Sequence, residues 1–327
     1  MRLSSTPDSA GDGTRGRKIM RVLAILIVGA AVGLAGCGLP NAGMTSDDLT
    51  IGMSVSTLSN PYFVQFRDGA EAAAQRHGVK LTVTDAQNDT SRQTADIQKF
   101  SQRHVKAIIL NPVDSAAAAP AVQAADRAGI PVIAADRGVS GCEVAQTVTS
   151  DNVAGGRLAA RELAKQLSGK GDVVVLQGAT GTSASRDRDQ GFTDGIAAHP
   201  DIKVIARQPA DFNRAKGQSV MTSLLQRHPG VTGVFASNDE MALGAIKALG
   251  SRAGQQVKVV SFDGTPDGIR AVQAGTMAAT VAQQPRLMGS MALNDAIKAA
   301  KGQAIAKSVA VPIKLATKAN ADEFWTF

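Results

Sequence analysis

Asp136 and Arg137 are a pair of residues whose types and position suggest binding chemistry. They follow the run Val132–Ala135, whose small or apolar residues indicate a strand buried on both faces. Open α/β sheets bind their ligands at the carboxyl ends of such strands. A carboxylate accepts hydrogen bonds from hydroxyls, and a guanidinium donates them from a rigid fork. The pair could therefore hold an uncharged polyol such as a sugar. The alternative is a surface ion pair that merely ends the strand.

The other predicted strands end in similar residues. Aromatic residues make up only 3% of the chain, yet several stand at strand ends among Asn and Asp. Flat rings pack on the C–H faces of a sugar, while amides and charges bind its hydroxyls. For Phe262, a position in the core explains the residue equally well. The side chains near these strand ends are Asn60, Tyr62, Phe63, Asn111, Asp136, Arg137, Arg188, Phe212, Asn238, Phe262, Asp263 and Gln283.

Repeated strand–helix units must position these side chains. From Leu49 onward, short apolar stretches alternate with amphipathic helical ones, for example Val153–Leu167 and Asn213–Arg227. The number of expected strands is too large for a single parallel sheet. The pattern therefore predicts two doubly wound α/β domains with a boundary near Ser150–Asp151. Strands are expected near residues 49–56, 80–86, 107–111, 131–136, 146–149, 172–177, 203–207, 232–236, 257–262, 277–282 and 311–317.

The first 36 residues are typical of an export signal. A basic stretch, Arg15–Arg21, precedes the apolar run Val22–Gly36, which is short for a membrane span but suits a signal peptide. The run ends in Leu34-Ala35-Gly36-Cys37, which resembles the signal of bacterial lipoproteins. We therefore expect an exported chain, lipidated at Cys37 and tethered to the cell membrane by a flexible stalk over 37–47. The alternative is a chance cysteine beside an ordinary signal.

Composition excludes several classes of function. A chain of 327 residues with 44% hydrophobic residues suits one or two globular domains with real cores. The net charge is +7, but residues 1–36 hold five basic and two acidic side chains. The remaining excess is mild and forms no basic stripe, so we expect no nucleic-acid partner. Cys142 is the only other cysteine, and no Cys/His cluster has the spacing of metal ligands. We expect no metal, no cofactor and no intramolecular disulfide.

Nine segments resemble the ribose-binding proteins of bacterial ABC importers, and together they run from about Leu49 to Lys318. The resemblance implies the type I periplasmic binding protein fold, which has two Rossmann-like α/β lobes with parallel sheets. Three hinge crossovers join the lobes, and the sugar is enclosed between them. The segments are VSTLSNPYF, LNPVDS, ADRG, TSDNVAGGR, LQGATGTSASRDRDQGF, QPADFNRAKG, FASNDEMALGA, FDGTPDG and ATVAQQP.

The resemblance also implies a role for each candidate residue. Tyr62, Phe63 and Phe212 would stack on the sugar, and Phe262 would lie at the pocket wall. Tyr62 departs from the family, which usually has Phe there, so its hydroxyl could favour a different sugar. The residues that would hydrogen-bond the sugar are Asn60, Asp136, Arg137, Arg188, Asn238, Asp263 and Gln283.

The implied crossovers divide the chain into lobes. They fall at Ser150–Asp151, just after Gln283 and near Pro312–Ile313. The N-terminal lobe is then 48–150 plus 284–312, and the C-terminal lobe is 151–283 plus 313–327.

The resemblance implies a receptor outside the cytoplasm that carries a monosaccharide, foremost D-ribose, to a membrane permease. The signal at Leu34–Cys37 adds the expected lipid anchor, and we expect a monomer. Allose, galactose, another pentose or a polyol remain open as ligands, and a chemoreceptor remains open as a further partner.

Competing functions have weaker support. The glycine-rich loop after Gly178 lacks the GK[ST] of a phosphate loop, and no G-x-S-x-G marks a hydrolase. Asp136 and Asp263 could form a glycosidase pair, but Arg and amide neighbours are expected to keep both carboxylates ionised. A sugar-sensing repressor of the same fold would need an N-terminal helix-turn-helix where this chain has a signal peptide. An exported sugar-modifying enzyme remains the alternative from another class.

Overall fold

The computed structural model describes residues 49–325, which belong to one compact unit. The predicted signal peptide 1–36, the lipidation site Cys37 and the stalk 37–47 lie outside the described residues. Between residues 49 and 325, no helix has both the length and the apolar character needed to cross a membrane.

The first sheet forms the centre of an N-terminal lobe. Its six strands are all parallel and lie in the order β11-β5-β4-β3-β1-β2. The apolar runs of β3 and β4 are fully buried because helices cover both faces of the sheet: α1 and α9 on one, α2 and α3 on the other. The elements are β1 (Thr50–Val55), α1 (Pro61–His77), β2 (Lys80–Asp85), α2 (Thr90–Gln102), β3 (Ala107–Leu110), α3 (Ala119–Arg127), β4 (Val132–Ala135), β5 (Gln146–Ser150), α9 (Pro285–Ala300) and β11 (Ser308–Val311).

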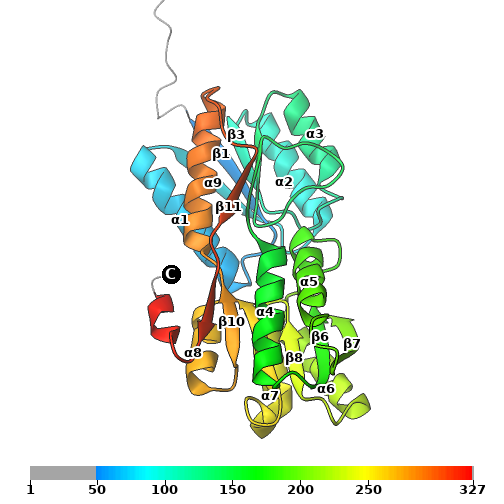
Figure 1. Cartoon of the computed structure of the whole chain (residues 1–327). Coiled ribbons are helices and arrows are strands. Elements are labelled where there is room, and N and C mark those ends of the chain that lie inside the picture. The colour runs from blue at the N-terminus through cyan, green and yellow to red at the C-terminus, as the bar shows by residue number, and fades with distance from the viewer. Residues whose placement is uncertain (1–48, 326–327) are drawn as a thin grey trace, which may run out of the picture. The chain divides into compact units, whose positions relative to one another are not determined.

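The second sheet forms a C-terminal lobe of the same design. Its six strands lie in the order β12-β10-β9-β8-β6-β7, and an apolar core fills the space on each face. In Figure 1, α4 and α5 lie side by side in this lobe, as α1 and α9 do in the other. The elements are α4 (Asn152–Gln166), β6 (Gly171–Gln177), α5 (Ser183–Ile196), β7 (Ile202–Pro209), α6 (Arg214–Arg227), β8 (Gly233–Ala236), α7 (Asp239–Leu249), the 3₁₀ turn Gly250–Arg252, β9 (Lys258–Asp263), α8 (Pro266–Ala274), β10 (Ala279–Ala282), β12 (Lys314–Thr317) and the 3₁₀ turn Ala321–Trp325.

The chain passes between the two sheets three times: from β5 to α4, from β10 to α9 and from β11 to β12 (Figure 1). The predicted architecture of two α/β lobes is confirmed. The expectation of one strand over 311–317 is wrong, because β11 and β12 belong to different sheets and Pro312 separates them. β12 also runs antiparallel to β10, so only the first sheet is wholly parallel. The exact lobe boundaries stay a prediction.

Helix N-termini gather polar residues at the strand ends. The side-chain oxygen of Asn60 accepts the Tyr62 N–H at 2.9 Å and so caps α1. Asn238 caps α7 in the same way through the Met241 N–H at 3.0 Å. Such caps satisfy backbone N–H groups that the first turn of a helix leaves unpaired. Because each helix begins where a parallel strand has just ended, these caps stand at the ligand edge of each sheet.

Candidate binding site

The predicted site residues surround one small cavity between the lobes. The cavity measures about 10 Å³, which is room for a single water at most. Two predicted residues stand behind its wall: Phe262 lies under the Arg188 guanidinium at 3.9 Å, and Gln283 contacts Asp263. The residues that line the cavity are Asn60, Tyr62, Phe63, Asp136, Arg137, Ala184, Arg188, Phe212, Asn238 and Asp263.

Asp136 and Arg137 are buried rather than a surface ion pair, with 4% of each residue exposed. The Asn111 amide donates to Asp136 Oδ2 at 3.2 Å, and Arg137 Nη1 donates to the Pro112 carbonyl at 2.8 Å. Arg137 Nε stands 3.7 Å from Asp136 Oδ2. Burial lowers the pKa of Arg137, although the Asp136 charge opposes this. The pair is therefore a preorganised set of acceptor and donor atoms at the end of β4.

Two aromatic rings enclose the Arg137 guanidinium. Its central carbon lies 5.2 Å from the centroid of Phe63 and 5.4 Å from that of Phe212. A cation over a ring face is attracted by the ring quadrupole. Phe63 comes from the N-terminal lobe and Phe212 from the C-terminal lobe, so Arg137 is clasped by both. Gly178 allows this arrangement, because a Cβ there would stand 2.1 Å from the Phe212 ring.

Arg188 and Asp263 form the matching pair in the C-terminal lobe. Arg188 Nη1 lies 3.3 Å from Asp263 Oδ1 and donates to the Ser237 carbonyl at 2.7 Å. Arg188 Nε donates to Asn152 Oδ1 at 2.8 Å, and Gln283 Nε2 donates to Asp263 Oδ1 at 2.8 Å. Both charged side chains are about 4% exposed. Each lobe thus presents one buried Asp–Arg pair to the cavity.

The expectation that Arg and amide neighbours keep Asp263 ionised is not supported, because burial is the largest influence on its pKa. Burial raises the pKa of Asp263 to about 8, although Arg188 lowers it. Asp239 and Asp136 add further negative charge nearby and raise the pKa again. The raised pKa favours the protonated form of the Asp263 carboxyl. The desolvation of a closed cavity outweighs one favourable arginine.

Tyr62 contributes a hydroxyl as well as a ring. The hydroxyl donates to Gln283 Oε1 at 3.3 Å and contacts Met288 Sδ at 3.8 Å. The ring meets Phe63 edge-on, with centroids 5.2 Å apart. Burial, together with the charges of Asp136 and Asp263, raises the pKa of Tyr62, so the hydroxyl stays protonated. Tyr62 of α1 thus reaches the crossover that follows β10.

Sequence reasoning missed the residues that hold the charged pairs. It placed Asn111 at a strand end without a role, and it assigned none to Asn152 or to the Ser237 carbonyl. Asn111 and Asn152 have matching functions, since each amide fixes one charged side chain of the cavity. Their only sequence signal is their position: Asn111 directly follows β3, and Asn152 stands two positions after the end of β5. For Asn60 and Asn238, capping occupies the side-chain oxygen, so only the amide nitrogen can donate to a ligand. One N–H of the Asn238 amide already donates to the Phe212 carbonyl at 3.4 Å, which leaves its second N–H.

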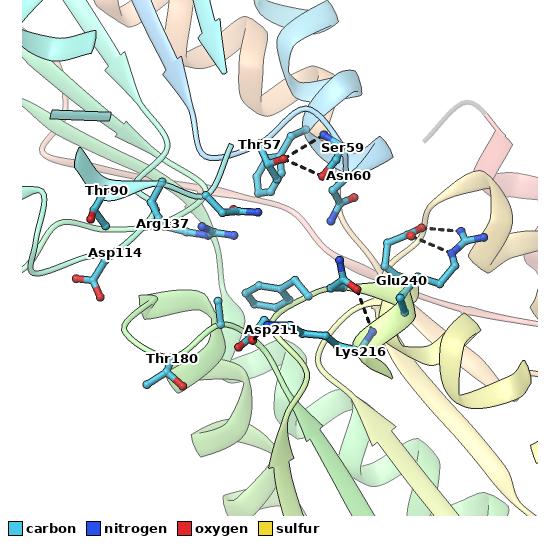
Figure 2. A pocket seen from close by; sticks show the side chains of 18 residues that line it. Thr57, Ser59, Asn60, Thr90, Asp114, Arg137, Thr180, Asp211, Lys216 and Glu240 are labelled. Carbon is cyan, nitrogen blue, oxygen red and sulfur yellow. Dashed lines mark hydrogen bonds and ion pairs between the residues drawn. The ribbon is translucent and has the colours of Figure 1, made fainter. Parts of the chain in front are cut away.

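A larger cleft of about 660 Å³ lies outside the cavity (Figure 2). Asn60, Phe63, Arg137 and Phe212 border both spaces. Ion pairs line the C-terminal side of this outer cleft: Lys216 with Asp211 at 2.5 Å, and Arg214 with Glu240 at 2.7 Å. The outer cleft is thus lined mostly by polar side chains and ends where the Arg137 guanidinium lies between the rings of Phe63 and Phe212. In the described part of the chain, no group of three or more His, Cys, Asp or Glu could hold a metal ion.

Residues 51–304 match the model of a family described as periplasmic binding protein domain. The chain therefore belongs to this family of extracytoplasmic solute-binding proteins. It is 45% identical over 299 residues to the ribose import binding protein of Escherichia coli (strain K12), covering 91% of this chain and 99% of that one. Its identity to the ribose import binding protein of Bacillus subtilis (strain 168) is 42% over 279 residues, covering 85% and 90%.

A solved structure shows the same architecture with a sugar bound. It is a periplasmic solute-binding protein of an ABC transporter from Actinobacillus succinogenes 130z, determined with bound D-allose. It is 33% identical to this chain with a TM-score of 0.79, and the match covers 84% of this chain and all of that one. The predicted resemblance to sugar receptors of ABC importers is confirmed by these relatives.

Proposed function

We propose that this chain captures a monosaccharide, foremost D-ribose, between its two lobes and delivers it to the permease of an ABC importer. The observation that carries the proposal is the pair of buried Asp–Arg couples, one from each lobe, that face one cavity. The ribose import proteins that resemble the chain support ribose as the first ligand. The allose-bound neighbour supports another monosaccharide as the alternative.

The cavity chemistry suits an uncharged polyol. Asp136 and Asp263 supply acceptors, while the two arginines and the Asn60 and Asn238 amides supply donors, so vicinal hydroxyls find partners of both kinds. Tyr62, Phe63 and Phe212 add flat apolar surfaces for the C–H faces of a ring.

We infer binding without catalysis. A glycosidase needs one acidic group and one base or nucleophile, with room for water beside the sugar. Asp263 has the raised pKa of an acid, but Arg188 and Gln283 already occupy its Oδ1. Asp136 is likewise held by Asn111 and Arg137. Incubation with candidate sugars followed by product analysis tests this inference, and any turnover would contradict it.

Export and anchoring belong to the same proposal. Cys37 would carry the lipid, which keeps the receptor beside its permease, and the lobes would work as one monomeric receptor. The predicted lobe boundaries at Ser150–Asp151, after Gln283 and at Pro312–Ile313 would act as hinges. Gln284 Nε2 donates to the Pro312 carbonyl at 3.2 Å, so two of these crossovers are in direct contact.

A thermal-shift panel of pentoses, hexoses and polyols tests the proposal. A ligand present at about 100 times its dissociation constant adds about 2.7 kcal/mol of stability. For a chain of this size, each kcal/mol raises the melting temperature by about 2–4 °C, so the expected rise is about 5–11 °C. We expect D-ribose to give the largest shift. A larger shift with D-allose or another sugar would reassign the ligand, and no shift with any sugar would contradict the proposed function.

A further inference from the structure

Three direct hydrogen bonds join the lobes beside the cavity without involving any residue that lines it. The Ser183 N–H donates to Ser115 Oγ at 3.0 Å, and the Gly138 N–H donates to Ser183 Oγ at 2.9 Å. The Ser115 N–H donates to the Gly181 carbonyl at 3.0 Å. Ser115 and Gly138 follow strands of the N-terminal lobe, whereas Gly181 and Ser183 precede and begin α5 of the C-terminal lobe.

These contacts are built into the two loops rather than made by flexible surface side chains. Ser115 is 1% exposed and Ser183 is 9% exposed. Ser183 is the first residue of α5, so the Ser115 hydroxyl satisfies an N–H that the first turn of a helix leaves unpaired. Gly181 has a φ of +90°, and a Cβ there would lie 1.9 Å from Asp114 Oδ2. The Asp114 side chain of the N-terminal lobe therefore packs directly against the backbone of Gly181.

The bonds favour the closed arrangement only. When the lobes part, the Ser183 and Gly138 N–H groups donate hydrogen bonds to water. Loss of a serine hydroxyl then has no effect on the free energy of the open form. When the lobes close, the Ser183 N–H is buried and the Gly138 N–H is partly buried, so each needs a partner, because an unpaired buried donor is costly. Removing either hydroxyl thus penalises the closed form and leaves the open form unchanged. A ligand that needs closure then binds more weakly, in proportion to the lost population.

We propose that Ser115 and Ser183 form a latch that sets the affinity for the sugar by stabilising the closed lobes without touching the sugar. The proposal rests on the proposed function, since it concerns the same capture step. Both serines are positioning residues. The latch stands next to the outer cleft, whose lining includes Asp114 and Thr180, so it closes the lobes beside the cleft while the approach stays open.

Calorimetry and stopped-flow kinetics of Ser115→Ala, Ser183→Ala and the double variant test the latch. The titrant is the sugar that gives the largest shift in the thermal panel, D-ribose by expectation. We expect each single variant to bind about 5- to 100-fold more weakly, the range of one unpaired buried donor. The change is expected in the dissociation rate, because the closed complex alone is destabilised. Ser185→Ala is the matched control. Ser185 lies on the same helix as Ser183, but its hydrogen bond to Thr182 stays within the C-terminal lobe and uses the backbone N–H that alanine keeps. We therefore expect this variant to bind the sugar as tightly as the wild type.

X-ray scattering of the sugar-free proteins gives a second readout that needs no ligand. The double variant is expected to have a larger radius of gyration than the wild type, because its closed population falls. Unchanged affinity together with superimposable scattering curves would overturn the latch. If the curves separate but no sugar binds the wild type, the latch stands and the proposed function fails.

Discussion

At the scale of single residues, the cavity depends on side chains that hold other side chains. Asn111 fixes Asp136, and Asn152 fixes Arg188, so the charged atoms of the candidate site are held in fixed orientations. Asp136 and Asp263 also have left-handed backbones, with φ of +66° and +115°. Backbone strain of this kind persists only where the surroundings impose it, and it gathers at functional sites. The geometry of the cavity is therefore preorganised, which lowers the cost of binding.

Replacing Arg188 tests the charged pair of the C-terminal lobe. Arg188→Ala leaves Asp263 buried without its cation, so we expect sugar binding to weaken by about 2–5 kcal/mol. Calorimetric titration measures the loss. Arg186→Ala is the matched control, because Arg186 lies on the same helix, is exposed and pairs only with Asp187 among the described contacts. Equal affinities of the two variants would remove Arg188 from the site.

Replacing Asn111 tests a residue that acts through another. Asn111→Ala removes the donor to Asp136 and leaves the Ser56 N–H without its 3.1 Å partner. We expect a loss of sugar affinity of about 1–3 kcal/mol. The control is Asn294→Ala, since Asn294 is bonded to His77 at the surface. Wild-type affinity in Asn111→Ala would show that Asp136 needs no orientation by its neighbour.

The pKa of Asp263 predicts how stability changes with pH. In the folded protein this pKa is about 8, against an ordinary value of 3.8. Between these two pH values the folded state keeps a proton that the unfolded chain has released. Stability therefore falls as pH rises through this window and levels off above it.

Asp263→Asn keeps the shape of the side chain and removes the titration. We expect the free energy of unfolding of the wild type, relative to this variant, to fall between pH 5 and pH 8 by at most about 1.4 kcal/mol per pH unit. Urea unfolding of both proteins, without sugar, measures this difference. Parallel pH profiles would mean that Asp263 is ionised in the empty protein.

At the scale of elements, the turn that ends β6 positions one ring of the cavity. Gly178 faces Phe212, and a Cβ there would collide with the ring. We expect Gly178→Ala to displace Phe212 and to weaken sugar binding by about 1 kcal/mol or more, the scale of one aromatic contact. Gly230→Ala is the control, because a Cβ at Gly230 meets open space. Calorimetry that finds both variants alike would show that Phe212 does not depend on this turn.

Most elements could be predicted because their signals are local. Val132–Ala135 is a short apolar run typical of a strand covered on both faces, and it forms β4 as expected. The prediction of one strand over 311–317 is wrong because β11 ends at Val311 and β12 begins at Lys314, with Pro312 between them. The two strands belong to different sheets. Sequence alone gives no information on which sheet a strand joins when the partners, β5 and β10, lie far away in the chain.

The site could be predicted as a set of residues but not as a set of bonds. Asp136 and Arg188 were recognisable as polar residues near strand ends and from the resemblance. The Asn111 and Asn152 contacts depend on side chains 25 and 36 positions apart in the sequence. The pKa of Asp263 depends on burial between two lobes, which no local pattern contains. Long-range geometry decides these features, so they emerge only from the folded chain.

At the scale of the whole molecule, capture requires both lobes. Phe63 and Asp136 come from one lobe, whereas Arg188, Phe212 and Asp263 come from the other. A cavity of about 10 Å³ is smaller than any sugar ring, so the walls must part before a sugar enters. A sugar that bonds both lobes then shifts the population towards a closed form. The crossovers are the segments expected to absorb this hinge motion.

Anchoring also belongs to the whole molecule, and it rests on Cys37. We expect the exported protein to partition with membranes, because a lipid on Cys37 adds apolar surface that water excludes. Cys37→Ser is expected to release the protein or to leave its signal uncleaved. Cell fractionation measures the partition, and intact-mass analysis measures the mature N-terminus. A mature chain that begins elsewhere and carries no lipid would contradict the anchor.

X-ray scattering with and without a saturating sugar tests the two-lobe capture most directly. The sugar is first shown to bind by calorimetry, with D-ribose as the expected ligand. We predict that the sugar lowers the radius of gyration of the wild type and that Asp263→Ala, at the same sugar concentration, blunts the change. Superimposable curves for the wild type with and without a sugar that binds would contradict the account, because the site would then belong to a single lobe.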